Sequence, residues 1–177
     1  MRLLVLVGNP RPRSRTLRVA LEAAAAVAER IGHADGADVV DLSLLAPGLL
    51  DASPPPAVQD ALDQVAAADL LLVAGPTFKA TYTGLLKVFL DRLPRGALAS
   101  TVALPMLVMG DVKHSLAVEV HLRPLLVELG AIVPAPGLAF LESQVPDAAE
   151  VLGDWAGLVA PQVSAALAGT AVLAEAP

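Results

Sequence analysis

Short apolar runs alternate with helix-length segments along the chain. Five runs have the length of a strand: Leu3–Val7, Asp38–Leu42, Leu70–Ala74, Val102–Val108 and a weaker one at Leu138–Phe140. Continuous apolar runs of this length are typical of strands that are covered on both faces of a sheet. The alternation therefore predicts βαβ units and a parallel sheet in an α/β domain.

The segments between these runs carry the start and stop signals of helices. The expected helices are Leu17–Ile31, Ala57–Ala68, Gly84–Leu93, His114–Leu129 and Asp147–Ala168. Thr16 is the expected cap of the first helix, and Gly32 is its expected end. Pro124 falls inside the fourth helix, where it removes a main-chain hydrogen bond, so we expect a kink or a one-residue π-bulge nearby.

Three loops are expected to meet at one edge of this sheet. They are Gly8–Thr16 after the first strand, Gly75–Gly84 after the third and Gly110–His114 after the fourth. In a doubly wound sheet, ligands bind in the crevice beyond the carboxyl ends of the strands, at the topological switch point. We therefore look for function in these loops.

The first loop has the composition of an anion-binding site. Arg11, Arg13 and Arg15 are a quarter of the chain's twelve Lys and Arg residues, and Ser14 and Thr16 add two hydroxyl groups. Free N–H groups at a helix start and forked guanidinium groups both favour phosphate oxygens. A merely solvated basic turn is the alternative. Because neither the dinucleotide glycine motif nor the P-loop motif is present, the loop indicates the phosphate of a mononucleotide.

The second loop is suited to a planar ligand. Phe78 and Tyr82 are two of the five aromatic residues in the chain, and Lys79 lies between them. Aromatic rings offer faces on which a planar group stacks. The alternatives are that Phe78 or Tyr82 fills the core beneath the loop, and that Lys79 is only a solvated charge.

Composition narrows the classes of function. The 177 residues, of which 55% are hydrophobic, suit a single domain, expected at 1–170 with a flexible tail at 171–177. A net charge of −6 argues against nucleic acid as a partner. Since the chain has no cysteine, any redox chemistry must come from a bound cofactor, and three scattered histidines predict no metal site.

The protein is expected in the cytoplasm and not in a membrane. The apolar run after Met1 is too short for a signal peptide. The apolar stretch Gly157–Ala174 is interrupted by polar residues and by Pro161, which favours a packed helix. A mean hydropathy of +0.65 and the broad apolar surface of Leu116–Leu129 predict a buried contact between subunits.

Three segments resemble the flavodoxin-like NAD(P)H-dependent FMN reductases, particularly those that supply reduced flavin to sulfonate monooxygenases. Gly8–Thr16 is similar to the family's phosphate loop G-S-P-R-x-x-S-R-[ST]. Pro76–Pro94 is similar to its signature P-x-Y-K-A-[AS]-Y-[ST]-G-x-L-K-x-[FL]-L-D-x-L-P, and His114–Pro124 to its helix H-L-L-A-[VL]-D-x-x-L-[KR]-P. Asn9 stands where the family has Ser, Phe78 stands where it has Tyr, and the third loop is more charged.

The resemblance covers residues 1–140 and implies a flavodoxin-like three-layer sandwich. In it, helices lie on both faces of a five-stranded parallel sheet of order 2-1-3-4-5, and the three loops form an FMN site. The implied cofactor-binding residues are Asn9; Arg11, Ser14, Arg15 and Thr16 around the 5′-phosphate; Pro76, Thr77, Phe78, Lys79, Ala80 and Tyr82 along the ribityl chain and ring; and Gly110, Asp111, Val112 and Lys113 at the ring edge. No catalytic side chain is assigned with certainty, since the flavin carries the chemistry, with Lys79, Tyr82 and Lys113 in support.

The implied activity is hydride transfer from NADPH or NADH to FMN. Reduced flavin would pass to an acceptor such as a partner monooxygenase, and the protein would be a homodimer or homotetramer. Two alternatives stay open: a reductase that retains FMN tightly and reduces quinones, azo dyes or metal oxyanions, and a non-enzymatic flavodoxin-like electron carrier. Carriers usually cradle the phosphate with neutral loops, so the three arginines favour a reductase.

Overall fold

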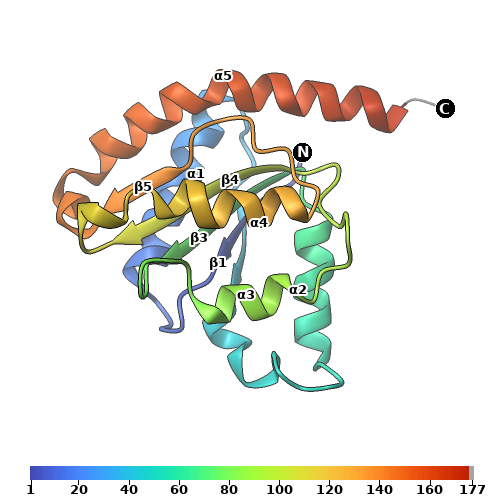
Figure 1. The fold of residues 1–177 in the computed structure, drawn as a ribbon. Coiled ribbons are helices and arrows are strands. Elements are labelled where there is room, and N and C mark those ends of the chain that lie inside the picture. The colour runs from blue at the N-terminus through green and yellow to red at the C-terminus, as the bar shows by residue number, and fades with distance from the viewer. Residues whose placement is uncertain (176–177) are drawn as a thin grey trace.

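A five-stranded parallel sheet forms the centre of the molecule (Figure 1). The computed structural model describes residues 1–175, with side chains as far as Thr170. The strands are β1 (Leu3–Val7), β2 (Asp38–Asp41), β3 (Leu70–Pro76), β4 (Val102–Met109) and β5 (Leu138–Leu141). Their order in the sheet is β2-β1-β3-β4-β5. The expected fold class and strand order are both confirmed.

Helices cover both faces of the sheet (Figure 1). On one face lie α1 (Arg15–Arg30) and α5 (Ala148–Glu175), and on the other lie α2 (Pro56–Ala66), α3 (Gly84–Leu90) and α4 (Arg123–Glu128). Strand β1 divides its side chains between the two cores: Leu4 and Leu6 join the core with α2 to α4, whereas Leu3, Val5 and Val7 join the core with α1 and α5. Because both faces are buried, the strand reads as one continuous apolar run.

Helix α1 begins earlier than expected. Its N-cap is Ser14 rather than Thr16, because the Ser14 side chain accepts a hydrogen bond from the N–H of Leu17. Thr16 lies in the first turn, where it is buried. Gly32 follows the helix with a φ of 72°, the left-handed conformation that often ends a helix.

The segment between β4 and β5 is not one regular helix. It contains a 3-10 turn at Val112–His114, a π-helix at Val118–Leu122 and then α4. Pro124 has no N–H to donate to the carbonyl of Val120, and the wide turn lies directly before it. The distortion that Pro124 predicts is therefore confirmed.

Helix α5 packs along α1 and the sheet, and its ribbon continues past the edge of the sheet (Figure 1). By length and composition alone, its segment up to Thr170 would be able to cross a membrane. Its buried residues Leu152, Trp155 and Val159, however, belong to the core of the domain. The helix extends to Glu175, into the segment 171–177 expected as a tail, and residues 176–177 lie outside the described part.

Candidate functional site

The loops that follow β1, β3 and β4 lie together at the left edge of the sheet in Figure 1, as expected for parallel strands. Between the first two of these loops is a cavity of about 140 Å³. It is lined by Asn9, Arg11, Ser14, Arg15, Thr16, Pro76, Phe78 and Glu142. Of these residues, only Glu142 was not among the predicted site residues. The structure thus brings the β1 and β3 loops together around one cavity, while the β4 loop borders the same edge outside this lining.

Buried hydrogen bonds hold the start of the β1 loop. The N–H of Gly8 donates to the carbonyl of Ala74 over 2.7 Å, and the hydroxyl of Thr83 donates to the carbonyl of Gly8 over 2.6 Å. The same Thr83 hydroxyl caps α3 by accepting from the N–H of Leu86. A Cβ atom on Gly8 would lie 2.6 Å from the Cβ of Leu86, so only glycine fits this approach.

The side-chain amide of Asn9 braces the rest of the β1 loop. Its Nδ2 donates to the hydroxyl of Thr16 over 2.9 Å, and its Oδ1 accepts from the N–H of Arg11 over 3.0 Å. Both Asn9 and Thr16 are buried. The residue that departs from the family pattern therefore ties the loop to the first turn of α1, and the loop has a defined shape.

Positive charge gathers around the N-terminus of α1. Arg11, Arg13 and Arg15 are exposed, and the first turn of α1 holds no acidic residue. Within the described residues, Arg11 and Arg13 form no ion pair, while Arg15 contacts Glu142 through Nη2 and Oε1 at 3.0 Å. The helix dipole and the guanidinium groups together favour an anion in the cavity.

The loop after β3 contains a strained two-residue turn. The N–H of Phe78 donates to the carbonyl of Thr81 over 2.9 Å, and the turn between them places Lys79 and Ala80 at φ 52° and 69°. This left-handed conformation costs about 1–2 kcal/mol for a residue with a Cβ. Phe78 is 47% exposed and lines the cavity, whereas Tyr82 is half-buried against the core. Of the two rings, Phe78 is the more accessible to a planar ligand.

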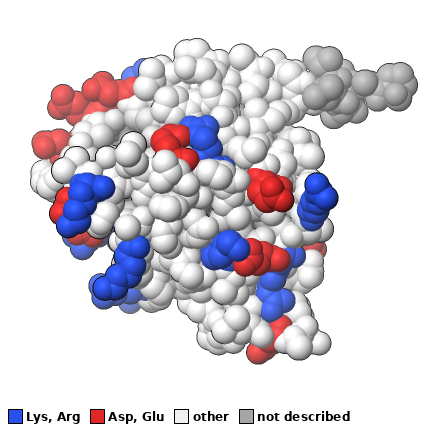
Figure 2. Space-filling view, in the orientation of Figure 1, with Lys and Arg blue, Asp and Glu red and all other residues white. Residues whose placement is uncertain are grey.

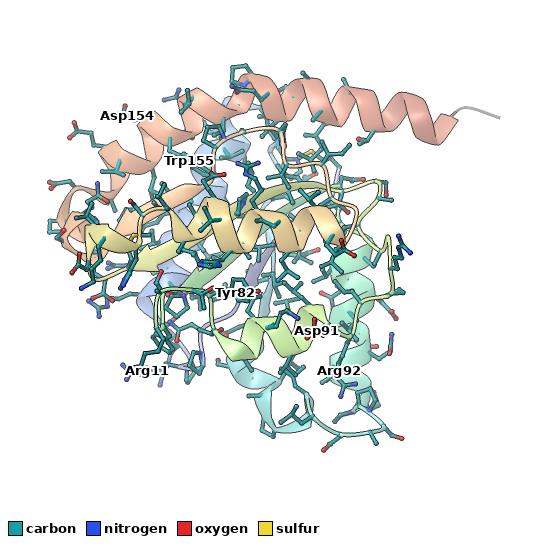
Figure 3. All side chains as sticks on the ribbon, viewed as in Figure 1. Arg11, Tyr82, Asp91, Arg92, Asp154 and Trp155 are labelled. Carbon is teal, nitrogen blue, oxygen red and sulfur yellow. The ribbon has the colours of Figure 1, made fainter. Side chains whose placement is uncertain are left out.

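The hydroxyl of Thr77 is buried and has no hydrogen-bond partner among the described residues. Its main-chain N–H is already used, because it donates to the carbonyl of Val108 over 2.8 Å. A buried hydroxyl without a partner is costly, and a ligand with hydroxyl or carbonyl groups would satisfy it. In Figure 3, Arg11 and Tyr82 lie toward this edge, whereas Asp91 and Arg92 lie at the other end of α3.

Among residues 1–170, the side-chain hydrogen bond and the ion pair of the loop after β4 both lie within the loop itself. The carboxylate of Asp111 accepts from the N–H of Lys113 over 3.0 Å and pairs with the Lys113 Nζ at 2.8 Å. These hydrogen bonds hold the pKa of Asp111 below its usual value. Gly110 through Lys113 are all exposed. The predicted ring-edge residues therefore lie at the same edge of the sheet as the other two loops, and Lys113 is paired with Asp111.

Two residues of the candidate site were not predicted from the sequence: Glu142, which lines the cavity, and Thr83, which holds the carbonyl of Gly8. Thr83 directly precedes Gly84, the first residue of α3, and threonine before a helix start is a capping signal that applies here. Glu142 directly follows β5 at Leu141, so the rule that ligands bind beyond strand ends also applied to it.

A larger cavity of about 420 Å³ lies at the opposite edge, between α1 and the turn before β2. It is lined mainly by alanines of α1 and by residues 33–37, and it includes no predicted site residue. The two cavities differ in their charge: the larger one is lined by Glu29 and Asp35, whereas the smaller one is lined by Arg11 and Arg15 and so is the one suited to an anion.

Residues 1–145 of the chain match the family described as NADPH-dependent FMN reductase. One relative, the FMN reductase (NADPH) of Escherichia coli K12, is 44% identical over 92 residues, which are 52% of this chain and 48% of the relative. The NADH-dependent FMN reductase SfnF of Pseudomonas fluorescens Pf0-1 is 32% identical over 93 residues, 52% of this chain and 50% of the relative. The matched part of the chain thus spans about half the length of these curated relatives.

Solved structures resemble the chain over a larger share. The apo form of the NADH:FMN oxidoreductase EMOB is 31% identical with a TM-score of 0.72, covering 97% of this chain and 89% of that one. An oxidoreductase from Corynebacterium diphtheriae is 28% identical with a TM-score of 0.77, covering 98% of both chains.

Proposed function

The chain belongs to the NADPH-dependent FMN reductase family, and from that premise we propose that it binds FMN at the carboxyl edge of its sheet and reduces it with NADPH or NADH. The observation that carries this proposal is the cavity beside α1. One part of its lining is cationic, from Arg11 and Arg15, and another is aromatic, from Phe78. A flavin mononucleotide has a phosphate at one end and a planar ring at the other.

The residues of the cavity suit the two parts of FMN. Arg11, Arg15 and the free N–H groups of the first turn of α1 would bind the phosphate. Ser14 and Thr16 would help shape this end. The unpartnered hydroxyl of Thr77 suits the ribityl chain, which carries hydroxyl groups.

The aromatic loop and the β4 loop would enclose the flavin ring. Pro76 to Tyr82 would lie along it, and Gly110 to Lys113 would border its edge. Bound FMN supplies the acceptor for the nicotinamide hydride. Main-chain N–H groups of Gly110 and Val112 would donate to the ring, and Lys79 or Lys113 would offset negative charge that develops on it.

Two assays test the proposal. FMN and riboflavin are titrated into the protein, and FMN should bind more tightly because riboflavin lacks the phosphate. Oxidation of NADPH and of NADH is then followed at 340 nm with and without FMN, and it should require FMN. Equal affinities for FMN and riboflavin would contradict the assignment of the cavity as a phosphate site. Oxidation without FMN would contradict the reductase, and no oxidation with FMN would point to the carrier.

A homo-oligomer and delivery of reduced flavin to a partner monooxygenase in the cytoplasm are further parts of the proposal. The face that carries α3 and α4 is mostly uncharged, with its charged residues in small separate groups (Figure 2). Leu116, Val120 and Val127 are each more than half exposed on the segment before and within α4. An apolar surface of this kind favours contact with a second copy. Light scattering at micromolar concentration should give a mass above the 18.1 kDa monomer.

A further inference from the structure

One carboxylate lies in the cavity whose other charged residues are arginines. Glu142 lines this cavity, and its Oε1 is 3.0 Å from Nη2 of Arg15. Every other residue of the lining is neutral or cationic. A carboxylate is out of place in a site for phosphate, because two negative groups at short distance repel each other.

The main chain keeps Glu142 at the cavity. It directly follows β5, in which Leu141 is in register with Met109 of β4. The side-chain oxygen of Gln144 accepts a hydrogen bond from the N–H of Leu141 over 2.8 Å, and Phe140 is completely buried. The main chain of Glu142 therefore stays at the cavity, and its carboxylate separates from Arg15 when either exposed side chain rotates.

The ion pair is weak enough to be exchanged. The side chains of Arg15 and Glu142 are 61% and 42% exposed, so water screens their attraction. A phosphate group at this position would bind Arg15 and also Arg11 and the N-terminus of α1, which the carboxylate of Glu142 does not replace. Phosphate should therefore displace the Glu142 carboxylate from Arg15. Because the main chain keeps Glu142 beside the cavity, the bound phosphate then lies close to a second negative charge, which weakens its binding.

We propose that Glu142 competes with the flavin phosphate for Arg15 and thereby keeps bound FMN exchangeable. This rests on the proposed function, because it takes the cavity beside α1 as the phosphate site. When the flavin leaves, the carboxylate returns to Arg15 and keeps the guanidinium at the site. Weakened retention suits a reductase that releases reduced FMN to an acceptor, and it opposes the alternative in which FMN is held tightly.

The variant Glu142→Gln tests this role, since it removes the charge and keeps the size of the side chain. Binding of FMN and of riboflavin is measured by flavin fluorescence, and dissociation of FMN by stopped flow. FMN should bind about three- to tenfold more tightly and leave more slowly, in the range of a screened charge pair. Riboflavin affinity should stay unchanged. The gain should shrink at high salt.

Glu128→Gln is the matched control. Glu128 is exposed at the end of α4, toward the amino ends of the strands, and its replacement changes the net charge by the same amount. The control should bind FMN as the wild type does. Equal tightening in both variants, or equal tightening for riboflavin, would overturn the specific role of Glu142.

The outcome also separates this inference from the site assignment. If Arg11→Ala weakens FMN binding and Glu142→Gln leaves it unchanged or weaker, only the role of Glu142 is wrong. If neither Arg11→Ala nor Glu142→Gln alters FMN binding, the phosphate site itself is misplaced and both proposals fail.

Discussion

The loops after β1 and β4, which the proposal assigns to the two ends of the flavin, are built in opposite ways. The β1 loop is tied to β3 through the N–H of Gly8, to the N-cap of α3 through the carbonyl of Gly8, and to α1 through the amide of Asn9. The β4 loop is exposed and is held by the Asp111–Lys113 contact within itself. The proposed phosphate end of the site is therefore preorganised, whereas the proposed ring end is open.

This difference suits the proposed chemistry. A fixed cradle loses little conformational entropy when it binds phosphate, so the binding energy is available for affinity. The ring must instead accept a nicotinamide beside it and then release it. Because the β4 loop is open and makes its contacts within itself, the nicotinamide can enter and leave without disturbing the β1 loop.

The largest expected effect is on the phosphate end. Arg11→Ala should weaken FMN binding by about 1.5–3 kcal/mol, because a charge-assisted contact is lost. Riboflavin binding and the unfolding midpoint should hardly change, since Arg11 is exposed. Titration calorimetry measures the affinities. Arg95→Ala, at an exposed arginine beyond the far end of α3, is the control and should bind FMN normally. Equal FMN affinity in both variants would contradict the assignment.

The second effect tests the rigidity of the β1 loop. Thr83→Val should lower the free energy of unfolding by about 1–2 kcal/mol, because the N-cap of α3 and the bond to the Gly8 carbonyl are both lost. Urea denaturation measures the change. Thr81→Val is the control, because no hydrogen bond of the Thr81 hydroxyl exists among the described residues, and it should change stability much less. Similar losses of stability in the two variants would mean that the hydrogen bonds of the Thr83 hydroxyl do not stabilise the β1 loop.

The third prediction concerns Glu119, in the π-helix that follows the β4 loop in the chain. Glu119 in the π-helix accepts hydrogen bonds from Arg123 and from the N–H of Gly137, and these contacts lower its pKa below the ordinary 4.5. Since the folded pKa is below the unfolded one, the stabilisation is complete above about pH 4.5 and is lost as the pH falls through the folded pKa.

The variant Glu119→Gln should lose about 1 kcal/mol of stability at neutral pH. Its stability should then fall less steeply than that of the wild type in acid. Urea denaturation over a pH series measures both slopes. Parallel curves for the two proteins would show that Glu119 contributes no acid sensitivity.

A smaller effect on stability is expected in the β3 loop. Ala80→Gly should stabilise the protein by about 0.5–1 kcal/mol, because glycine adopts a φ of 69° without the Cβ penalty. Thermal unfolding measures the gain. A loss of stability would mean that the turn relaxes at no cost in the native protein.

The smallest effect belongs to the β4 loop. Asp111→Asn removes the exposed pair with Lys113, and stability at neutral pH should stay the same within error. FMN affinity should also change far less than in Arg11→Ala. A large loss of either quantity would show that the β4 loop is as closely tied as the β1 loop, and the contrast between them would fail.

The periodic features of the fold were predictable because they depend on neighbours in sequence. Strand β1 was predicted with its observed bounds, since each of its residues is buried and apolar. Pro124 predicted the irregular helix, because the absence of an N–H group is a property of the proline residue itself. Most of the cavity lining was likewise predicted from loop composition and from the family resemblance.

By itself, the sequence determined the order of strands and helices, the absence of thiol chemistry and the concentration of arginine in one loop. Only the tertiary structure decided that Thr83 holds the carbonyl of Gly8 and that Glu142 reaches Arg15. The physical reason is distance along the chain. A hydrogen bond or ion pair between residues 75 or more positions apart depends on how strands register and helices pack, and no local pattern encodes it.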